Sequence, residues 1–168
     1  MEFEKVIRER SSVRKYSGAA VDAETLESIL EAGRLAPTAK NLQPVKIYVV
    51  RSDEGLAAID RATKCRYGAG TVLAVCGSEE AAYHKGSYST YEMDSTIVAV
   101  HMMLEATNVG VDNIFVEAFD ADVLRSELQI PAELTPVGLL MLGYRTEDCP
   151  VNPNHTVRKS LSELAEYL

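Results

Sequence analysis

Arginine and serine side chains cluster near the N-terminus in an arrangement suited to binding an anion. Arg10, Ser11, Ser12 and Arg14 place two guanidinium groups and two hydroxyls within five residues. Guanidinium groups donate paired hydrogen bonds to phosphate oxygens, and hydroxyls can satisfy the oxygens that remain. A solvated patch of salt bridges at a helix end has the same composition, so this segment alone leaves both interpretations open.

A second segment, "APTAKNLQP" at residues 36–44, combines rigid backbone with two amide side chains. Pro37 and Pro44 restrict the direction of the chain, while Asn41 and Gln43 offer both hydrogen-bond donors and acceptors. Amides of this kind can bind the polar edge of a heteroaromatic ring. The alternative is a capped turn in which Asn41 bonds only to its own backbone.

Motifs for several other chemistries are absent from the sequence. The glycines of "GAGTVL" at 68–73 precede a predicted strand, whereas those of a dinucleotide-binding turn follow one. Cys65, Cys76 and Cys149 are widely spaced, which argues against disulfides, zinc and iron–sulfur clusters. His101 falls in an apolar segment and is interpreted as a core residue. We therefore expect no metal site and no catalytic nucleophile or base.

Apolar periodicity predicts the elements that must position the two polar segments. We expect Leu26, Ile29, Leu30 and Leu35 to face inward from the second helix, with Asp22 as its N-cap. Helices and strands mix without regular βαβ repetition, which predicts one α+β domain over residues 1–168. Helices are expected at 2–10, 23–35, 53–63, 92–107, from about 120 to Pro131 and from Ser160 or Ser162, and strands at 45–50, 71–76, 113–119 and 137–144.

The predicted helix at 92–107 is apolar on nearly all sides, so it must be buried on several of them. A chain of 168 residues has little mass with which to surround such a helix, and we therefore expect a second copy to cover part of it in a homodimer. The polar, tyrosine-rich segment at 78–91 lacks a clear period. It is expected to be a loop or frayed helix and is a candidate lid.

Composition limits the partners of the protein. The formal net charge is −8, with acidic and basic residues interspersed, which disfavours broad contacts with nucleic acid or an anionic membrane. The first ten residues are charged and contain no apolar targeting segment, and no apolar run is long enough to span a membrane. We expect a cytoplasmic protein that acts on a small molecule.

Taken together, the motifs resemble those of the nitroreductase family of flavin enzymes. Arg10, Ser12 and Arg14 match the family's N-terminal basic motif, and "APTAKNLQP" matches its Ala-Pro-Ser/Thr-x-x-Asn-x-Gln-Pro motif. The segments "MDSTIVAVHMMLEATNVGVDNIFV" and "PVGLLMLGYR" are similar to the family's central helix and late strand. The resemblance covers nearly the whole chain. It implies an α+β fold with a central mixed or antiparallel sheet flanked by helices, in a homodimer that binds FMN at the subunit interface.

The resemblance also implies which residues would hold the FMN phosphate or ribityl chain. Arg10 and Arg14 would bind it, with Ser11 or Ser12 adding hydrogen bonds. Arg158 is the corresponding basic candidate near the C-terminus, acting in its own subunit or in the partner.

For the isoalloxazine ring, the resemblance points to two other segments. Asn41 would hydrogen-bond the edge of the ring, with Gln43 close to it. Phe115, Glu117 and Ala118 would lie along the ring, where backbone N–H groups can address it.

The activity implied by the resemblance is transfer of electrons from NADH or NADPH to a small organic acceptor, such as a nitroaromatic or a quinone, in alternating half-reactions. Val45 and Ala118 depart from the family pattern, which usually has an aromatic residue and a glycine there.

One alternative function is a flavin-binding module, or a specialised flavin-utilising protein, without efficient NAD(P)H turnover. Another is an interaction domain whose arginines are merely solvated. The choice of acceptor and the preferred nicotinamide are not encoded in any single residue.

Overall fold

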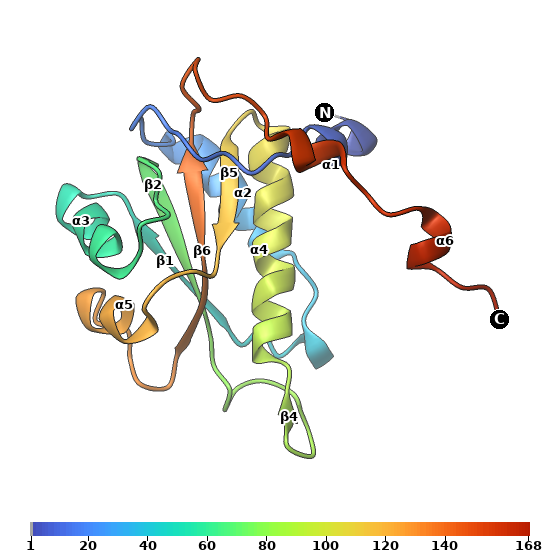
Figure 1. The fold of residues 1–168 in the computed structure, drawn as a ribbon. Helices are drawn as coiled ribbons and strands as arrows, with labels where there is room; N and C mark the ends of the chain where they lie inside the picture. Colours follow the sequence, from blue (N-terminus) through green and yellow to red (C-terminus); the bar gives the residue numbers. More distant parts are fainter. Residues whose placement is uncertain (1) are drawn as a thin grey trace.

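The computed structural model describes residues 2–168 and has three layers, with a sheet between two layers of helices (Figure 1). The sheet is entirely antiparallel, in the order β1-β2-β6-β5. This confirms the α+β class. The strands are β1 Val45–Val50, β2 Thr71–Gly77, β5 Asp112–Val116 and β6 Thr135–Gly143, with a separate hairpin of β3 His84–Lys85 and β4 Tyr88–Ser89. The helices are α1 Phe3–Glu9, α2 Ala23–Arg34, α3 Asp53–Ala62, α4 Tyr91–Asn108, α5 Ala121–Glu127 and α6 Leu161–Leu164, with short 3₁₀ turns η1 Ala39–Asn41 and η2 Pro153–Thr156.

Alternation along the central strand β2 divides the core between the two faces of the sheet. Leu73 and Val75 pack in a cluster with residues of α2 and α4. Val72, Ala74 and Cys76 pack in a second cluster with residues of α3 and α5. Because both faces of β2 are covered, every residue of this strand is buried, which explains its continuous apolar sequence.

Helix α4 is covered on one side only within this chain. Asp94, Ser95, Val98, Ala99, Met102 and Ala106 form its buried face. Its other side carries an apolar row, the α4 stripe, that consists of Met93, Ile97, Val100 and Leu104. Met93 is 54% exposed and Val100 39% exposed, while the other two are partly buried. The prediction that this helix is buried on several sides is therefore not met by a single chain.

Several local predictions need correction. The segment at 78–91 contains the hairpin β3–β4, which turns at Gly86, rather than a frayed helix. Leu35 lies beyond the end of α2 and is 66% exposed, because the helix ends at Arg34 ahead of Pro37. Strand β5 ends at Val116, so residues 117–119 lie in the loop that follows it.

The C-terminal segment at 157–168, which we call the C-terminal arm, extends away from the three layers (Figure 1). Its helix α6 begins after Ser160, whose side chain forms a capping box with Glu163. This start agrees with the predicted one. The apolar side chains of the arm do not pack on the chain's own core, and Leu161 is 80% exposed.

Candidate functional site

The arginines predicted to bind phosphate gather in one hollow, the basic pocket, of about 280 Å3. Arg10 lies at the end of α1, Arg14 lies four residues further on, and Arg158 follows η2. The structure thus brings together side chains that lie more than 140 residues apart in the chain. The pocket is lined by Arg10, Ser11, Ser12, Arg14, Asn152, Asn154, His155 and Arg158.

Hydrogen bonds to backbone carbonyls fix both walls of the basic pocket. Ser12 pairs with Asn113 in a parallel bridge along the outer edge of β5, and the N–H of Val13 donates to the carbonyl of Asn113 at 3.1 Å. On the opposite wall, the His155 ring lies 2.8 Å from the backbone oxygen of Arg8, in hydrogen-bond contact between η2 and α1. The N-terminal and C-terminal segments are therefore held side by side.

The basic pocket has an excess of positive charge. Among residues 2–168, no Asp or Glu lines the basic pocket. Arg10, Arg14 and Arg158 take part in none of the ion pairs found in this part of the chain. Burial lowers the pKa of Arg10, and the nearby Arg158 guanidinium lowers it further. In a protein of net charge −8, such a cluster is a favourable place for an anion.

Within this chain, Ser11 makes a contact that the sequence did not predict. It is buried, and its Oγ accepts a hydrogen bond of 3.2 Å from Nη2 of Arg145. Arg145 is itself paired with Asp112, with Nη2 at 2.5 Å from Oδ1. Ser11 therefore links the pocket wall to this ion pair, while Ser12 is the less buried of the two serines.

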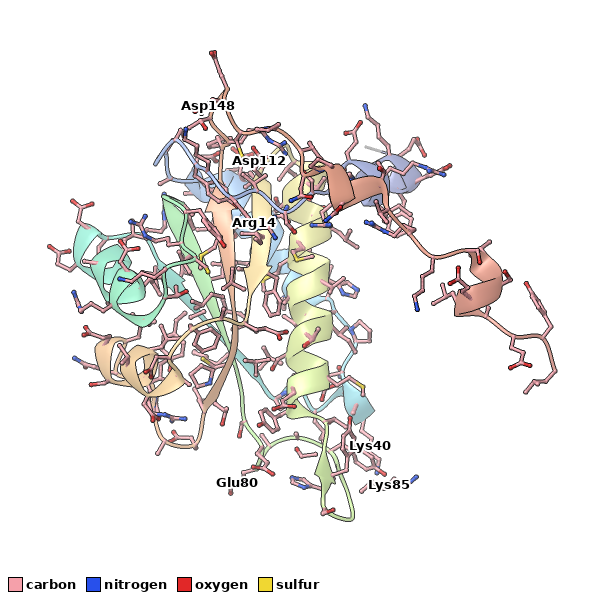
Figure 2. The ribbon with its side chains drawn as sticks, viewed as in Figure 1. Arg14, Lys40, Glu80, Lys85, Asp112 and Asp148 are labelled. Carbon is pink, nitrogen blue, oxygen red and sulfur yellow. The ribbon has the colours of Figure 1, made fainter. Side chains whose placement is uncertain are left out.

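The segment that carries Asn41 and Gln43 lies at the other end of α4. We call residues 38–43 the amide loop. The N–H of Ala39 donates to Oδ1 of Asp94, in the first turn of α4, whereas Arg10 lines a hollow with Thr107 in the last turn. The helix between Asp94 and Thr107 spans about 20 Å. Figure 2 shows Arg14 and Lys40 near opposite ends of α4.

The amide loop has an unusual backbone. Lys40, Asn41 and Gln43 have φ values of 51°, 56° and 52°, in the left-handed region that residues with a Cβ seldom adopt. Asn41 and Gln43 are both exposed. Gln43 also lines an apolar cavity of about 280 Å3 between α2, β1 and α4, together with Val45.

The remaining predicted ring contacts, Phe115, Glu117 and Ala118, do not line the basic pocket. The Phe115 side chain packs over Gly138 of the neighbouring strand, on the α4 side of the sheet. Glu117 and Ala118 are exposed in the loop after β5. The carbonyl of Ala118 accepts a hydrogen bond of 2.6 Å from Thr63 Oγ1, so this part of the loop is anchored.

Sequence reasoning missed several residues of the basic pocket. Asn152, Asn154 and His155 line it, and the Pro/Asn-rich "CPVNPNH" was the available signal, because such turns often carry function. Tyr67 is a further neighbour of Arg14. Its pKa is raised, first by its hydrogen bond with the Cys65 thiol, whereas the Arg14 guanidinium acts in the opposite direction.

Other reactive groups do not form a second centre in the described part of the chain. Residues 2–168 contain no group of three or more potential ligands that could hold a metal ion. Cys76 is buried, and burial raises the pKa of its thiol to about 11, which keeps it protonated. None of the helices described in residues 2–168 has the length and apolarity needed to cross a membrane.

Comparisons with known proteins place this fold and these motifs in one family. The profile described as the nitroreductase family matches residues 7–67 and 64–144. A protein of Archaeoglobus fulgidus, provisionally named an NADH dehydrogenase/NAD(P)H nitroreductase, is 28% identical over 151 residues, which cover 86% of each chain. The chain described here belongs to the nitroreductase family.

Two solved structures share the whole architecture. The crystal structure of a nitroreductase family protein from Clostridium difficile 630 is 32% identical, with a TM-score of 0.92, and the match covers 99% of this chain and 98% of that one. A provisionally named nitroreductase from Exiguobacterium sibiricum, solved in complex with FMN, has a TM-score of 0.88 at 22% identity, over 100% and 98% of the two chains. The fold class predicted from the sequence is thereby confirmed.

Proposed function

We propose that this protein is an FMN-dependent oxidoreductase that passes electrons from NADH or NADPH to a small organic acceptor. The observation that carries the proposal is the basic pocket, where Arg10, Arg14 and Arg158 converge without a carboxylate among the described lining residues. The Arg10 and Arg158 guanidinium groups repel each other, and an anion between them would relieve this repulsion. Family membership and the FMN-bound neighbour support a flavin phosphate as that anion.

The residues present fit the polar groups of FMN. Arg10, Arg14 and Arg158 supply cationic donors for the phosphate, and Ser12, Asn152 and Asn154 supply neutral hydrogen-bonding groups beside them. Bound FMN would supply the two-electron redox chemistry, which the protein side chains cannot perform. The protein's own contribution is to bind, orient and balance charge, so this site requires no nucleophile or general base.

A homodimer would bring the amide loop to the basic pocket. The α4 stripe is apolar and runs along the helix, with Met93 and Val100 exposed, which makes it suitable for packing against its own copy. In a two-fold dimer with antiparallel α4 helices, the start of one α4 lies near the end of the other. Asn41 and Gln43 of the partner subunit would then stand near Arg10 and Arg14, as the predicted flavin contacts require.

The C-terminal arm supports the same assembly. Leu161, Leu164 and Tyr167 are all exposed on a segment that projects from the body (Figure 1). Apolar side chains presented in this way are stabilised when a second chain covers them. We propose that the arm packs on the partner subunit.

The cofactor test uses the purified full-length protein. We expect a flavin absorption spectrum as isolated, or binding of added FMN with quenching of its fluorescence, and weaker binding of riboflavin, which lacks the phosphate. Anaerobic stopped-flow mixing with NADH and NADPH should then bleach the bound flavin, and a panel of nitroaromatics and quinones should reoxidise it.

Different failures of this test have different meanings. A protein that binds neither endogenous nor added FMN is not a flavin enzyme, and the proposal is then wrong. FMN binding with slow reduction by both nicotinamides would instead indicate a flavin-binding or specialised flavin-utilising protein.

A further inference from the structure

A buried carboxylate at the start of α4 anchors the amide loop. Asp94 is 2% exposed, and its Oδ1 accepts a hydrogen bond of 2.9 Å from the N–H of Ala39. Its Oδ2 accepts one of 2.8 Å from Thr90 Oγ1. Each carboxylate oxygen has a donor, and the first turn of a helix favours negative charge. Asp94 is therefore a satisfied structural contact and not an open ligand site.

The hydrogen bond to Asp94 acts on a segment whose backbone conformation is unfavourable. The left-handed φ values of Lys40, Asn41 and Gln43 are unfavourable for residues with a Cβ, so contacts must maintain them. Inside the loop, the N–H of Gln43 donates to Thr38 Oγ1 at 3.0 Å. The hydrogen bond from the N–H of Ala39 to Asp94 ties the loop to α4.

The same carboxylate connects the amide loop to the hairpin. Thr90, which donates to Asp94, closes the base of the hairpin segment because its N–H donates to the carbonyl of Tyr83 at 3.1 Å. Lys40 Nζ lies 4.3 Å from the centre of the Tyr83 ring, in a cation–π contact. These contacts connect the amide loop, the hairpin and the start of α4 to one another around Asp94.

We infer that Asp94 is a positioning residue for the flavin site: it fixes the amide loop in the conformation that presents Asn41 and Gln43, and couples that loop to the hairpin. The inference rests on the proposed function. Asp94 does not touch the cofactor. Its effect on flavin binding is transmitted by the Ala39 N–H and by the backbone of the two following residues.

The test compares Asp94→Ala with Asp94→Asn in the full chain. Asp94→Ala removes the acceptor for Ala39, so amide hydrogen exchange at Ala39 should accelerate in the flavin-free protein. The Kd for FMN should rise roughly tenfold, the order expected for losing a hydrogen bond to a charged acceptor. The visible circular dichroism of the bound flavin should change as well. Asp94→Asn keeps an oxygen that can accept from Ala39 and should restore most of the affinity.

A control separates positioning from general stability. Ala99→Gly alters a buried residue in the middle of α4 and lowers helix stability without contacting the amide loop. It should lower Tm but leave the Kd for FMN unchanged. If Asp94→Ala lowers Tm but leaves the Kd for FMN and the flavin dichroism at their wild-type values, the inference is overturned. Failure of the wild type to bind FMN overturns the proposed function instead, and Ala39 exchange then decides separately whether Asp94 holds the loop.

Discussion

Arg10 is the residue whose substitution tests the basic pocket most directly. It is half-buried beside Arg158, and no carboxylate lines the pocket among the residues described. Arg10→Ala should raise the Kd for FMN about tenfold to a hundredfold, because a charge-assisted hydrogen bond contributes roughly 1.5–3 kcal/mol. Without flavin, the same variant should be no less stable than the wild type, since repulsion from Arg158 is relieved. Fluorescence titration and thermal unfolding of the flavin-free protein measure the two effects.

Arg8→Ala is the matched control for this experiment. Arg8 lies two residues earlier, on the exposed part of α1, and its guanidinium is paired with Glu4. Its loss should leave the Kd for FMN unchanged. Equal flavin affinity in Arg10→Ala and Arg8→Ala would remove Arg10 from the phosphate site.

At the scale of single residues, the basic motif could be predicted but the partners of each side chain could not. The types and spacing of Arg10, Ser12 and Arg14 already indicated an anion site. Two other features depend on contacts between distant segments: Ser11 accepts a hydrogen bond from Arg145, and Asn152 and His155 complete the pocket. Residue type specifies what a group can bind, whereas packing decides which group is near.

At the scale of elements, close packing between β5 and β6 gives a prediction about stability. A Cβ added at Gly138 would lie 2.1 Å from Cζ of Phe115, so the ring must move if this glycine is replaced. Gly138→Ala should therefore destabilise the protein by about 1–3 kcal/mol. Urea unfolding at fixed protein concentration measures the change.

A double-mutant cycle identifies the cause. Phe115→Leu provides room for the new methyl group, so the double variant should lose less stability than the sum of the two single variants. Strictly additive losses would show that Gly138 matters for another reason.

The elements themselves were largely predictable, with errors where local pattern was weak. Asp22 caps α2 and Ser160 caps α6 as their residue types suggested, because capping is a contact between near neighbours. The hairpin at 84–89 was missed because each of its strands has only two residues, too few to show a period. Leu35 was predicted to face inward because it continues the apolar spacing of α2. The sequence pattern did not show that the helix ends at Arg34.

At the scale of the whole molecule, the proposed homodimer gives a prediction that joins assembly to cofactor binding. Val100→Glu places a charge in the α4 stripe and should convert dimers to monomers at micromolar concentration. FMN affinity should fall in parallel, because Asn41 and Arg10 of one chain lie at opposite ends of α4. Light scattering coupled to size exclusion, combined with flavin titration, measures both.

Ala57→Glu serves as the control for added charge, since Ala57 is exposed on α3 in the opposite helix layer. It should leave the dimer and the flavin unchanged. A Val100→Glu protein that remains dimeric with full FMN affinity would show that α4 is not the interface, and a monomeric wild type would refute the homodimer itself.

The opening motifs, "RERSSVR" and "APTAKNLQP", show which properties are local and which are not. Their residue types are sufficient to predict an anion site and a rigid amide-bearing loop, because charge, hydrogen-bonding capacity and backbone restriction belong to the residues themselves. The resemblance to the nitroreductase family implied that both motifs contact FMN. In the folded chain, Ala39 contacts α4 at Asp94 and Arg10 lines a hollow with Thr107, two points about 20 Å apart along the helix. Proximity depends on how the elements pack, and here the length of α4 keeps Asn41 and Arg10 apart within a single chain.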